Sequence, residues 1–184
     1  MLAKAKKRLR LAPTTRVLYV RHARAHQRRS WEGDDDLRPL DKKGRRQAEM
    51  LVPMLTPFHP TAIYSAPPQR CQHTAAPLAD ELGMDIAVNK AFGDDVFTES
   101  PESARAAFQR VVDGGGVPVI VSQGLTIPGI IESYAPKFIT TPIDELKFKK
   151  ASVWVLSFND GELTGADYLC LLYTSDAADE GLGV

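Results

Sequence analysis

Short apolar segments alternate with helical segments along this chain, and three of the apolar segments end in a polar turn. Segments 17–20, 62–65 and 117–121 are rich in β-branched and aromatic residues, which is typical of buried strands. Between them we expect one helix capped by Asp41 and another that stops at Gly83. This alternation predicts an α/β fold of three layers, α/β/α, with a mostly parallel central sheet and 117–121 as its central strand.

The rest of the chain continues this alternation, with glycine and proline marking the breaks. We expect Pro53 to kink the helix that follows Asp41 or to end it early. The dipeptide Asp160-Gly161 is typical of a hairpin turn. The remaining segments are assigned as a strand at 85–88, an acidic loop at 93–102, a helix to about 112, a break at 113–116, a short helix at 127–134, and hairpin strands at 152–158 and 162–168.

The length of 184 residues fits one domain with a sizeable core. Apolar residues make up 43% and charged residues 25% of the chain, a balance that excludes a disordered or membrane-embedded chain. No apolar run approaches the roughly 20 residues of a membrane-spanning helix, and the basic start lacks the apolar core of a secretory signal. Cys71 and Cys170 are too few for a disulfide framework and are wrongly spaced for zinc. We therefore expect a cytoplasmic protein with no membrane partner and no metal.

Basic residues gather in the first part of the chain, although the formal net charge is zero. Residues 1–50 contain 15 Lys and Arg against 6 Asp and Glu, whereas the remainder contains 8 against 17. Basic groups beside a phosphate pocket raise the local concentration of anionic substrates. Because no aromatic interleaving accompanies these charges, a nucleic acid is not the expected partner.

Composition also divides the chain into three parts. Residues 1–15 are predicted to be a basic linker or a disordered start, and residues 16–169 the folded domain. From Cys170 onward the sequence has no place in the strand and helix pattern and looks like translated adapter sequence. Residues 170–184 are therefore predicted to be an artefactual or disordered tail.

Polar side chains follow three of the predicted strands. In chain order the turns contribute Arg21 and His22, then Ser65 and Arg70, and then Gln123 and Gly124. In open α/β sheets, ligands bind at the carboxyl ends of the strands, so we expect these three turns to converge on one site.

These residue types suit the transfer of a phosphoryl group. The forked guanidinium groups of Arg21 and Arg70 can each donate to two phosphate oxygens and stay charged at any working pH. Their charges disfavour an imidazolium, so His22 is expected to be neutral and nucleophilic. A hydrogen bond to the other ring nitrogen must fix its tautomer, and the sequence does not reveal that partner. No metal or cofactor is required.

The motifs carry a resemblance to a known family. Arg21-His22-Ala23 resembles the Arg-His-Gly signature of the histidine phosphatases, and segments 38–48 and 65–74 resemble those of the short, SixA-like phosphohistidine phosphatase branch. The resemblance covers about residues 15 to 169. It implies a phosphoglycerate mutase-like fold and a metal-independent phosphohydrolase that forms a phosphohistidine at His22, with a phosphohistidine protein as one substrate.

Four shorter segments are similar to the C-terminal half of proteins that join a Nudix hydrolase to a histidine phosphatase domain: 12–25, 31–35, 64–68 and 122–124. Those fusions are associated with 8-oxo-guanine nucleotides, which implies a nucleoside di- or triphosphate as the other substrate. The resemblance also implies a Nudix domain as a partner, and a homodimer is a further expectation. The chain itself could be a fragment of such a fusion.

The chain departs from the family pattern in the turn after the central strand, where the superfamily usually has a second histidine and this chain has Gln123. A neutral donor is about half as strong as a charged one, so turnover could be slower, or His73 or Arg28 could take the role. The alternative function is therefore a weakened phosphate-binding module that regulates or dimerises a Nudix hydrolase. Asp94 is the expected proton donor, with Asp95 and Glu99 as alternatives.

Several other residues receive structural interpretations. We expect Cys71 to be a small helix-face residue and not a nucleophile. Trp31 is expected either to stack on a base or to be partly buried in the core. Arg28 is the first candidate to bind a distal phosphate, together with Arg29. The remaining histidines are expected to be surface or packing residues: His26, His59 and His73.

Overall fold

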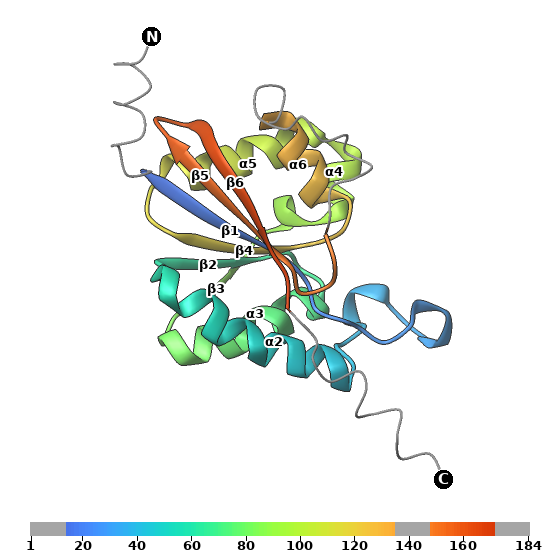
Figure 1. Ribbon diagram of the computed structural model, residues 1–184. Helices are drawn as coiled ribbons and strands as arrows, with labels where there is room; N and C mark the ends of the chain where they lie inside the picture. Colours follow the sequence, from blue (N-terminus) through green and yellow to red (C-terminus); the bar gives the residue numbers. More distant parts are fainter. Residues whose placement is uncertain (1–13, 135–147, 172–184) are drawn as a thin grey trace.

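The computed structural model describes residues 14–134 and 148–171 and contains a central sheet of six strands (Figure 1). The strands lie in the order β3-β2-β4-β1-β5-β6. The first four in that order are mutually parallel, β5 runs antiparallel to β1, and β6 pairs with β5 as an antiparallel hairpin. Their bounds are β1 Thr15–Arg21, β2 Ala62–Ser65, β3 Ile86–Val88, β4 Pro118–Ser122, β5 Val153–Asn159 and β6 Glu162–Leu169.

Helices cover both faces of this sheet, which confirms the predicted three-layer α/β fold (Figure 1). The helices α2 and α3 pack on one face, whereas α4, α5 and α6 lie on the other. Their bounds are α2 Lys42–Leu55, α3 Gln69–Leu82, α4 Asp94–Glu99, α5 Pro101–Asp113 and α6 Thr126–Tyr134. Four short 3-10 helices complete the described elements: η1 Arg28–Ser30, η2 Asp35–Leu37, η3 Thr56–Phe58 and η4 Lys90–Phe92.

The expected caps and turns form as local chemistry predicts. The carboxylate of Asp41 accepts from the Gly44 amide over 2.7 Å at the start of α2. Gly83 ends α3 in the left-handed region at φ 61°. Asp160 and Gly161 both have positive φ, at 49° and 77°, as a two-residue hairpin turn requires.

Two of the predicted boundaries differ from the structure. Helix α2 continues through Pro53 to Leu55, so the proline falls in the last turn, where the helix loses a single hydrogen bond. The predicted acidic loop at 93–102 is wrong, because α4 and the start of α5 occupy it. Ser100 caps α5 through the Ser103 amide and Pro101 is its first residue, which are two start signals that the acidic composition concealed.

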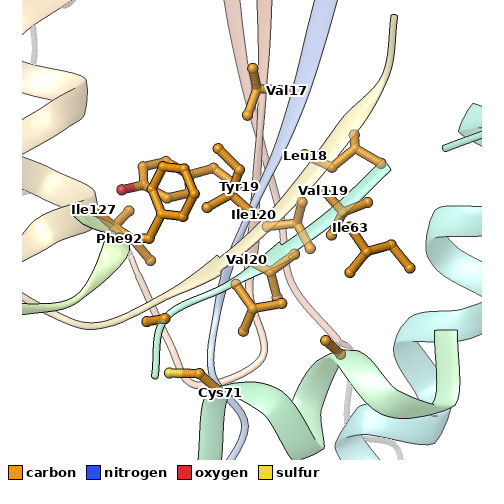
Figure 2. Packing of buried hydrophobic residues seen from close by; sticks show 14 of the residues in the cluster. Val17, Leu18, Tyr19, Val20, Ile63, Cys71, Phe92, Val119, Ile120 and Ile127 are labelled. Carbon is orange, nitrogen blue, oxygen red and sulfur yellow. The ribbon is translucent and has the colours of Figure 1, made fainter. Parts of the chain in front are cut away.

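The core surrounds β4, in which all five residues are buried, as expected of the central strand (Figure 2). Tyr19 of β1 lies with its ring centroid 5.2 Å from that of Phe108 in α5. On the other face, Cys71 of α3 is fully buried beside the end of the sheet. One core thus connects both helical layers to the two central strands.

Within the described ranges, no helix has both the length and the apolar character that crossing a membrane requires. Residues 1–13 and 172–184 lie outside the described residues, so the expectations for the two ends of the chain stay predictions.

Helix α2 supports the loop that follows β1. The Arg24 amide donates to Oε1 of Gln47 over 2.8 Å, and the Arg24 guanidinium pairs with Asp41 at 2.8 Å. Gly44 packs directly under this loop, because a Cβ at that position would lie 1.8 Å from the carbonyl oxygen of Arg24. The segment 38–48 therefore acts as a support for the end of β1.

We predict that Gly44→Ala destabilises the fold by at least about 1–3 kcal/mol, because its Cβ must displace a backbone carbonyl. Urea unfolding measures the change. Gly165→Ala is the matched control, because a Cβ there would lie at an ordinary 3.7 Å from Ser157. This substitution also removes a glycine from a strand, where glycine is unfavourable. Equal free energies of unfolding for the two variants would contradict the predicted contact.

Candidate active site

The three polar turns converge at the carboxyl ends of β1, β2 and β4, as expected. The His22 amide donates to the Ser122 carbonyl of β4 over 3.0 Å, and the Ala66 amide donates to the Val121 carbonyl over 2.9 Å. These bonds bring the residues that follow each strand to one edge of the sheet. His22 itself is 4% exposed.

The tautomer of His22 is set by a carbonyl of its own loop. Its Nδ1 lies 2.8 Å from the carbonyl oxygen of Ala23, and because a carbonyl only accepts, Nδ1 carries the proton. The other ring nitrogen, Nε2, therefore keeps a lone pair. It lies 3.1 Å from Nζ of Lys150, whose ammonium donates to it.

Burial lowers the pKa of His22 to about 3, and the positive charge of Lys150 acts in the same direction. The hydrogen bond to Ala23 opposes this shift, whereas the charges of Arg70 and Arg21 add to it. The expected neutral ring is therefore found, but its main cause is desolvation, and the arginines contribute less than expected. Neutral imidazole is the nucleophilic form.

Thr74 anchors the loop that carries the tautomer-fixing carbonyl. Its hydroxyl accepts from the Ala23 amide over 2.9 Å and donates to the Arg70 carbonyl over 2.6 Å. The hydroxyl thus joins the turn after β1 to the first turn of α3.

The Arg21 guanidinium packs between Phe148 and Gly124. Its Nη1 donates to the Phe148 carbonyl, and its Cζ lies 5.9 Å from the centroid of the Phe148 ring. A Cβ on Gly124 would lie 3.0 Å from Nη2 of Arg21, so the glycine leaves the space that the guanidinium uses. Burial lowers the pKa of Arg21, and the charge of Asp94 partly offsets this.

Arg70 is 3% exposed and is held by Asp35. Its Nη1 donates to the Asp35 carbonyl over 2.7 Å, and its Nη2 lies 3.1 Å from Oδ2 of the same residue. Its buried Nε has no hydrogen-bond partner within the described residues. A guanidinium with an unused buried donor is suited to an additional anionic acceptor.

The Asp35 carboxylate pairs with three arginines. Besides Arg70, it pairs with Arg28 through Nη2 at 3.1 Å and with Arg38 through Nε at 2.9 Å. Burial alone raises the pKa of Asp35, but hydrogen bonds from Arg38 and Arg28 and the charge of Arg70 outweigh it, so the pKa falls to about 2. Arg28 therefore reaches the edge of the site, but its guanidinium binds a carboxylate of the chain itself.

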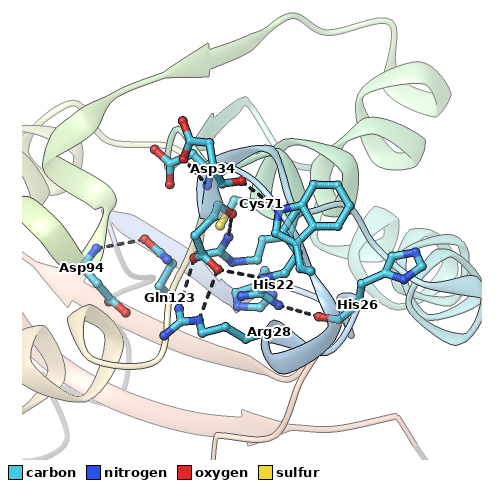
Figure 3. Close-up of polar contacts among 12 residues, drawn as sticks. His22, His26, Arg28, Asp34, Cys71, Asp94 and Gln123 are labelled. Carbon is cyan, nitrogen blue, oxygen red and sulfur yellow. Dashed lines mark hydrogen bonds and ion pairs between the residues drawn. The ribbon is translucent and has the colours of Figure 1, made fainter.

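A hydrogen bond links Gln123 and Asp94 (Figure 3). Oε1 of the buried Gln123 accepts from the Asp94 amide over 2.9 Å. The side chain can therefore offer a ligand only the donors of its NH₂ group. Oδ1 of Asp94 accepts from the amides of Leu125 and Thr126, at 3.1 and 2.9 Å, and from the Thr126 hydroxyl at 2.8 Å. The Asp94 carboxylate thus also holds the turn that leads into α6.

Ser65 and Cys71 are both buried. Ser65 was expected to bind substrate; its hydroxyl donates to the Ala66 carbonyl over 2.8 Å. In this structure the hydroxyl supports the end of β2, and a role in binding substrate stays a prediction. Burial raises the pKa of the Cys71 thiol to about 12, which agrees with the expectation that it is not a nucleophile.

The other singled-out side chains make local contacts. Trp31 is partly exposed, and its Nε1 donates to the Asp34 carbonyl over 2.9 Å, with its ring centroid 6.4 Å from that of His26. His59 ends η3 in the left-handed region. His73 lines a hollow of about 340 Å³ between α2 and α3 that none of the expected site residues lines.

Sequence reasoning missed Lys150 and Asp35. Lys150 belongs to no motif and precedes the last hairpin, and only the antiparallel placement of β5 beside β1 brings it to His22. Asp35 lies in an acidic run whose individual members the sequence does not distinguish. Across residues 14–134 and 148–171, no group of three His, Cys, Asp or Glu side chains is placed to hold a metal ion.

We predict that His22 shows the nitrogen chemical shifts of a neutral ring protonated at Nδ1 between about pH 5 and 9, because its pKa of about 3 lies below that range. Long-range ¹H–¹⁵N correlation spectra measure this, and His22→Gln assigns the signals by removing them. A titration midpoint for His22 between about pH 5.5 and 7.5 would show that burial does not control its charge.

Comparison with known proteins places these features in context. The family model of the histidine phosphatase superfamily (branch 1) matches residues 17–98. The 8-oxo-(d)GTP phosphatase of Mycolicibacterium smegmatis is 42% identical over 156 residues, which cover 85% of this chain. The chain spans 48% of the length of that relative.

Solved structures share the fold at lower identity. The protein histidine phosphatase SixA, complexed with tungstate, aligns with a TM-score of 0.66 and 16% identity over 82% of this chain and 95% of its own. A mycobacterial glucosyl-3-phosphoglycerate phosphatase aligns with a TM-score of 0.61 and 17% identity over 77% of this chain and 92% of its own. The fold is therefore that of the phosphoglycerate mutase-like histidine phosphatases. In sequence, residues 17–98 match the histidine phosphatase superfamily (branch 1), and the fold agrees with this match.

Proposed function

We propose that this chain is a phosphohydrolase that transfers a phosphoryl group to Nε2 of His22 and then to water. One observation carries the proposal: Nε2 has a lone pair because Nδ1 donates to Ala23, and the positive charges of Lys150, Arg70 and Arg21 act on this ring. A fixed neutral nucleophile among cations is the arrangement that phosphoryl transfer requires.

The reaction proceeds in two balanced steps. The Nε2 lone pair forms a bond to phosphorus while the bond from phosphorus to the leaving oxygen breaks, and that oxygen takes the electron pair together with a proton from an acid. Water then attacks phosphorus and gives its proton to the same carboxylate, and the electron pair of the N–P bond returns to Nε2. The Nδ1 proton of His22 stays on the ring throughout, held by Ala23.

Guanidinium groups neutralise the charge of the transferring group in this proposal. Arg21 is held in place by Phe148, so its orientation is fixed before a ligand arrives. Arg70 has an unused Nε donor and is nearly fully buried, where charge-assisted bonds are strong. Since arginines supply this charge, turnover is expected to persist in a chelator.

Asp94 is the proposed proton donor, through Oδ2. Its Oδ1 accepts the hydrogen bonds that hold the turn into α6, and Asp94 lies close enough to Arg21 to shift the pKa of that guanidinium. The other oxygen can then carry the proton for the leaving group.

The substrate proposed first is an 8-oxo-guanine nucleoside di- or triphosphate, because the relative at 42% identity is named for such a substrate. The exposed Arg28 at the edge of the site is the side chain proposed to bind a further phosphate, in exchange for Asp35. A phosphohistidine protein is the second substrate to test, since the SixA fold is shared. A cytoplasmic location, a Nudix domain partner and a homodimer are proposed on the sequence grounds alone.

We predict that His22→Ala lowers kcat/KM for p-nitrophenyl phosphate by at least about 10³-fold in the presence of a chelator, because the nucleophile is lost. Release of inorganic phosphate measures the rate. His59→Asn is the matched control, because His59 is distant from the pocket and asparagine accepts its positive φ. Undiminished turnover in His22→Ala would falsify the mechanism.

Comparing substrates in the same assay separates the functions. Preference for 8-oxo-dGTP or 8-oxo-dGDP over dGTP supports the nucleotide substrate, whereas preference for a phosphohistidine peptide supports the protein substrate. Binding of inorganic phosphate without turnover of any substrate, also after Gln123→His, supports the phosphate-binding module instead.

We predict that Asp94→Asn slows hydrolysis of an alkyl phosphate by about 10²–10⁴-fold but changes p-nitrophenyl phosphate turnover far less, because p-nitrophenolate leaves without a proton. The amide oxygen can still accept from Thr126, so the fold is retained. Asp95→Asn and Glu99→Gln on the same helix are the controls. Equal losses for both esters in Asp94→Asn would show that the residue only supports the turn.

A further inference from the structure

Lys150 touches the reacting atom of the proposed site. Its Nζ lies 3.1 Å from Nε2 of His22 and donates a hydrogen bond to that lone pair. Although Lys150 is an exposed residue, its ammonium thus reaches the one nitrogen that can attack phosphorus. The phosphoryl group must occupy the space directly beside this ammonium.

The turn that carries Lys150 is bonded to the backbone of the nucleophile. The Ala151 amide donates to the carbonyls of Arg21 and His22, at 3.1 and 3.3 Å, and the Arg21 amide donates to the Ser152 carbonyl over 3.0 Å. Ala151 is fully buried with φ 57°, so the backbone adopts an uncommon conformation next to the lysine. Lys150 is therefore positioned by the same strand end that positions His22.

A charged donor is missing from the turn after β4. Gln123 occupies the place where the superfamily usually has its second histidine, and its Oε1 is used by the Asp94 amide. What remains is a neutral NH₂ group, which binds a phosphoryl oxygen about half as strongly as a charged donor. A cation from another element would complete the charge of the pocket.

We propose that Lys150 is a catalytic residue that binds the transferring phosphoryl group and supplies the positive charge that Gln123 does not. This inference rests on the proposed function of His22. Without a ligand, the ammonium donates to Nε2 and covers the nucleophile. When a phosphoryl group enters, the ammonium donates to one of its oxygens, and the lone pair of Nε2 is released at the moment when its target is in place.

Lys150→Met tests this role because it keeps the length and apolar part of the side chain. We expect it to weaken binding of inorganic phosphate by about 10- to 100-fold, the effect of one charged hydrogen bond, and to lower kcat/KM for p-nitrophenyl phosphate by about 10²–10³-fold. Isothermal titration calorimetry and phosphate release give the two values. Lys149→Met is the matched control, since Lys149 makes its contact to Tyr168 through its backbone amide.

Placing a histidine at position 123, directly after β4, gives a second readout, which a purely structural role of Lys150 would not produce. In the Lys150→Met background, Gln123→His is expected to recover kcat/KM by at least about tenfold, because the new donor faces the same phosphoryl group. Failure of Gln123→His to recover any activity there, in a protein that melts at the wild-type temperature, counts against a shared role.

The pH dependence provides a third readout. The titratable and charged groups that face this ammonium are His22, Arg21, Arg70, Arg38 and Cys71. Although much of the residue is exposed, desolvation of its ammonium beside His22 and the charges of the arginines lower the pKa of Lys150 to about 8. Phosphate binding is therefore expected to weaken as the pH rises through about 8 and the ammonium loses its proton. Lys150→Arg is expected to remove this alkaline limb, because a guanidinium stays charged.

The outcomes separate this inference from the proposed function. Unchanged phosphate binding in Lys150→Met overturns the role of Lys150, whatever the wild type hydrolyses. If the wild type binds phosphate through Lys150 but hydrolyses no ester, the proposed function fails and the binding role stands. A wild type that binds no phosphate at millimolar concentration overturns both.

Discussion

Nδ1 of His22 donates to the Ala23 carbonyl over 2.8 Å, and the reactivity of the ring depends on this contact. The bond keeps the proton on Nδ1 and leaves a lone pair on Nε2, the proposed nucleophile. The carbonyl holds its direction because Thr74 binds the Ala23 amide and Gly44 allows α2 to pack against the next residue of the loop. Pairing of β1 with β4 sets where this loop begins. Both helices of one layer and the centre of the sheet thus determine the state of one nitrogen atom.

Among the described residues, three cationic side chains act on the ring that carries this nitrogen. Arg21, Arg70 and Lys150 all disfavour an imidazolium at His22, and burial acts in the same direction. The carboxylate of Asp35 balances Arg70 but lies in a loop at the edge of the site, where Arg28 and Arg38 share it. Neighbouring like charges repel each other, and an anion between them reduces this repulsion. A dianionic phosphoryl group would supply such an anion in the proposed function.

The parts of the structure that sequence reasoning predicted are those that local chemistry determines. The strands at 17–20 and 62–65, the cap at Asp41 and the stop at Gly83 each depend on a few neighbouring residues, and each forms as expected. That His22 and Arg70 lie at one edge of the sheet was predicted from the rule that ligands bind at the carboxyl ends of parallel strands. Lys150 could not be found in this way, because its contact joins residues 128 positions apart through an antiparallel strand. The same holds for the Asp35 contact to Arg70, which links η2 to the first turn of α3.

Phosphoryl transfer requires positive charge beside the transferred group, but the residue that supplies it can come from different segments of the chain. The end of β1 has two neighbours in the sheet, β4 on one side and β5 on the other, so a side chain from either can reach a group bound at His22. Gln123 follows β4, and Lys150 precedes β5. Because β5 is antiparallel, its beginning lies beside the end of β1. A residue that precedes β5 can therefore reach His22, as Lys150 does. A site for a phosphoryl group can therefore be complete without a histidine in the turn after β4, provided that a cation such as Lys150 comes from the segment before β5.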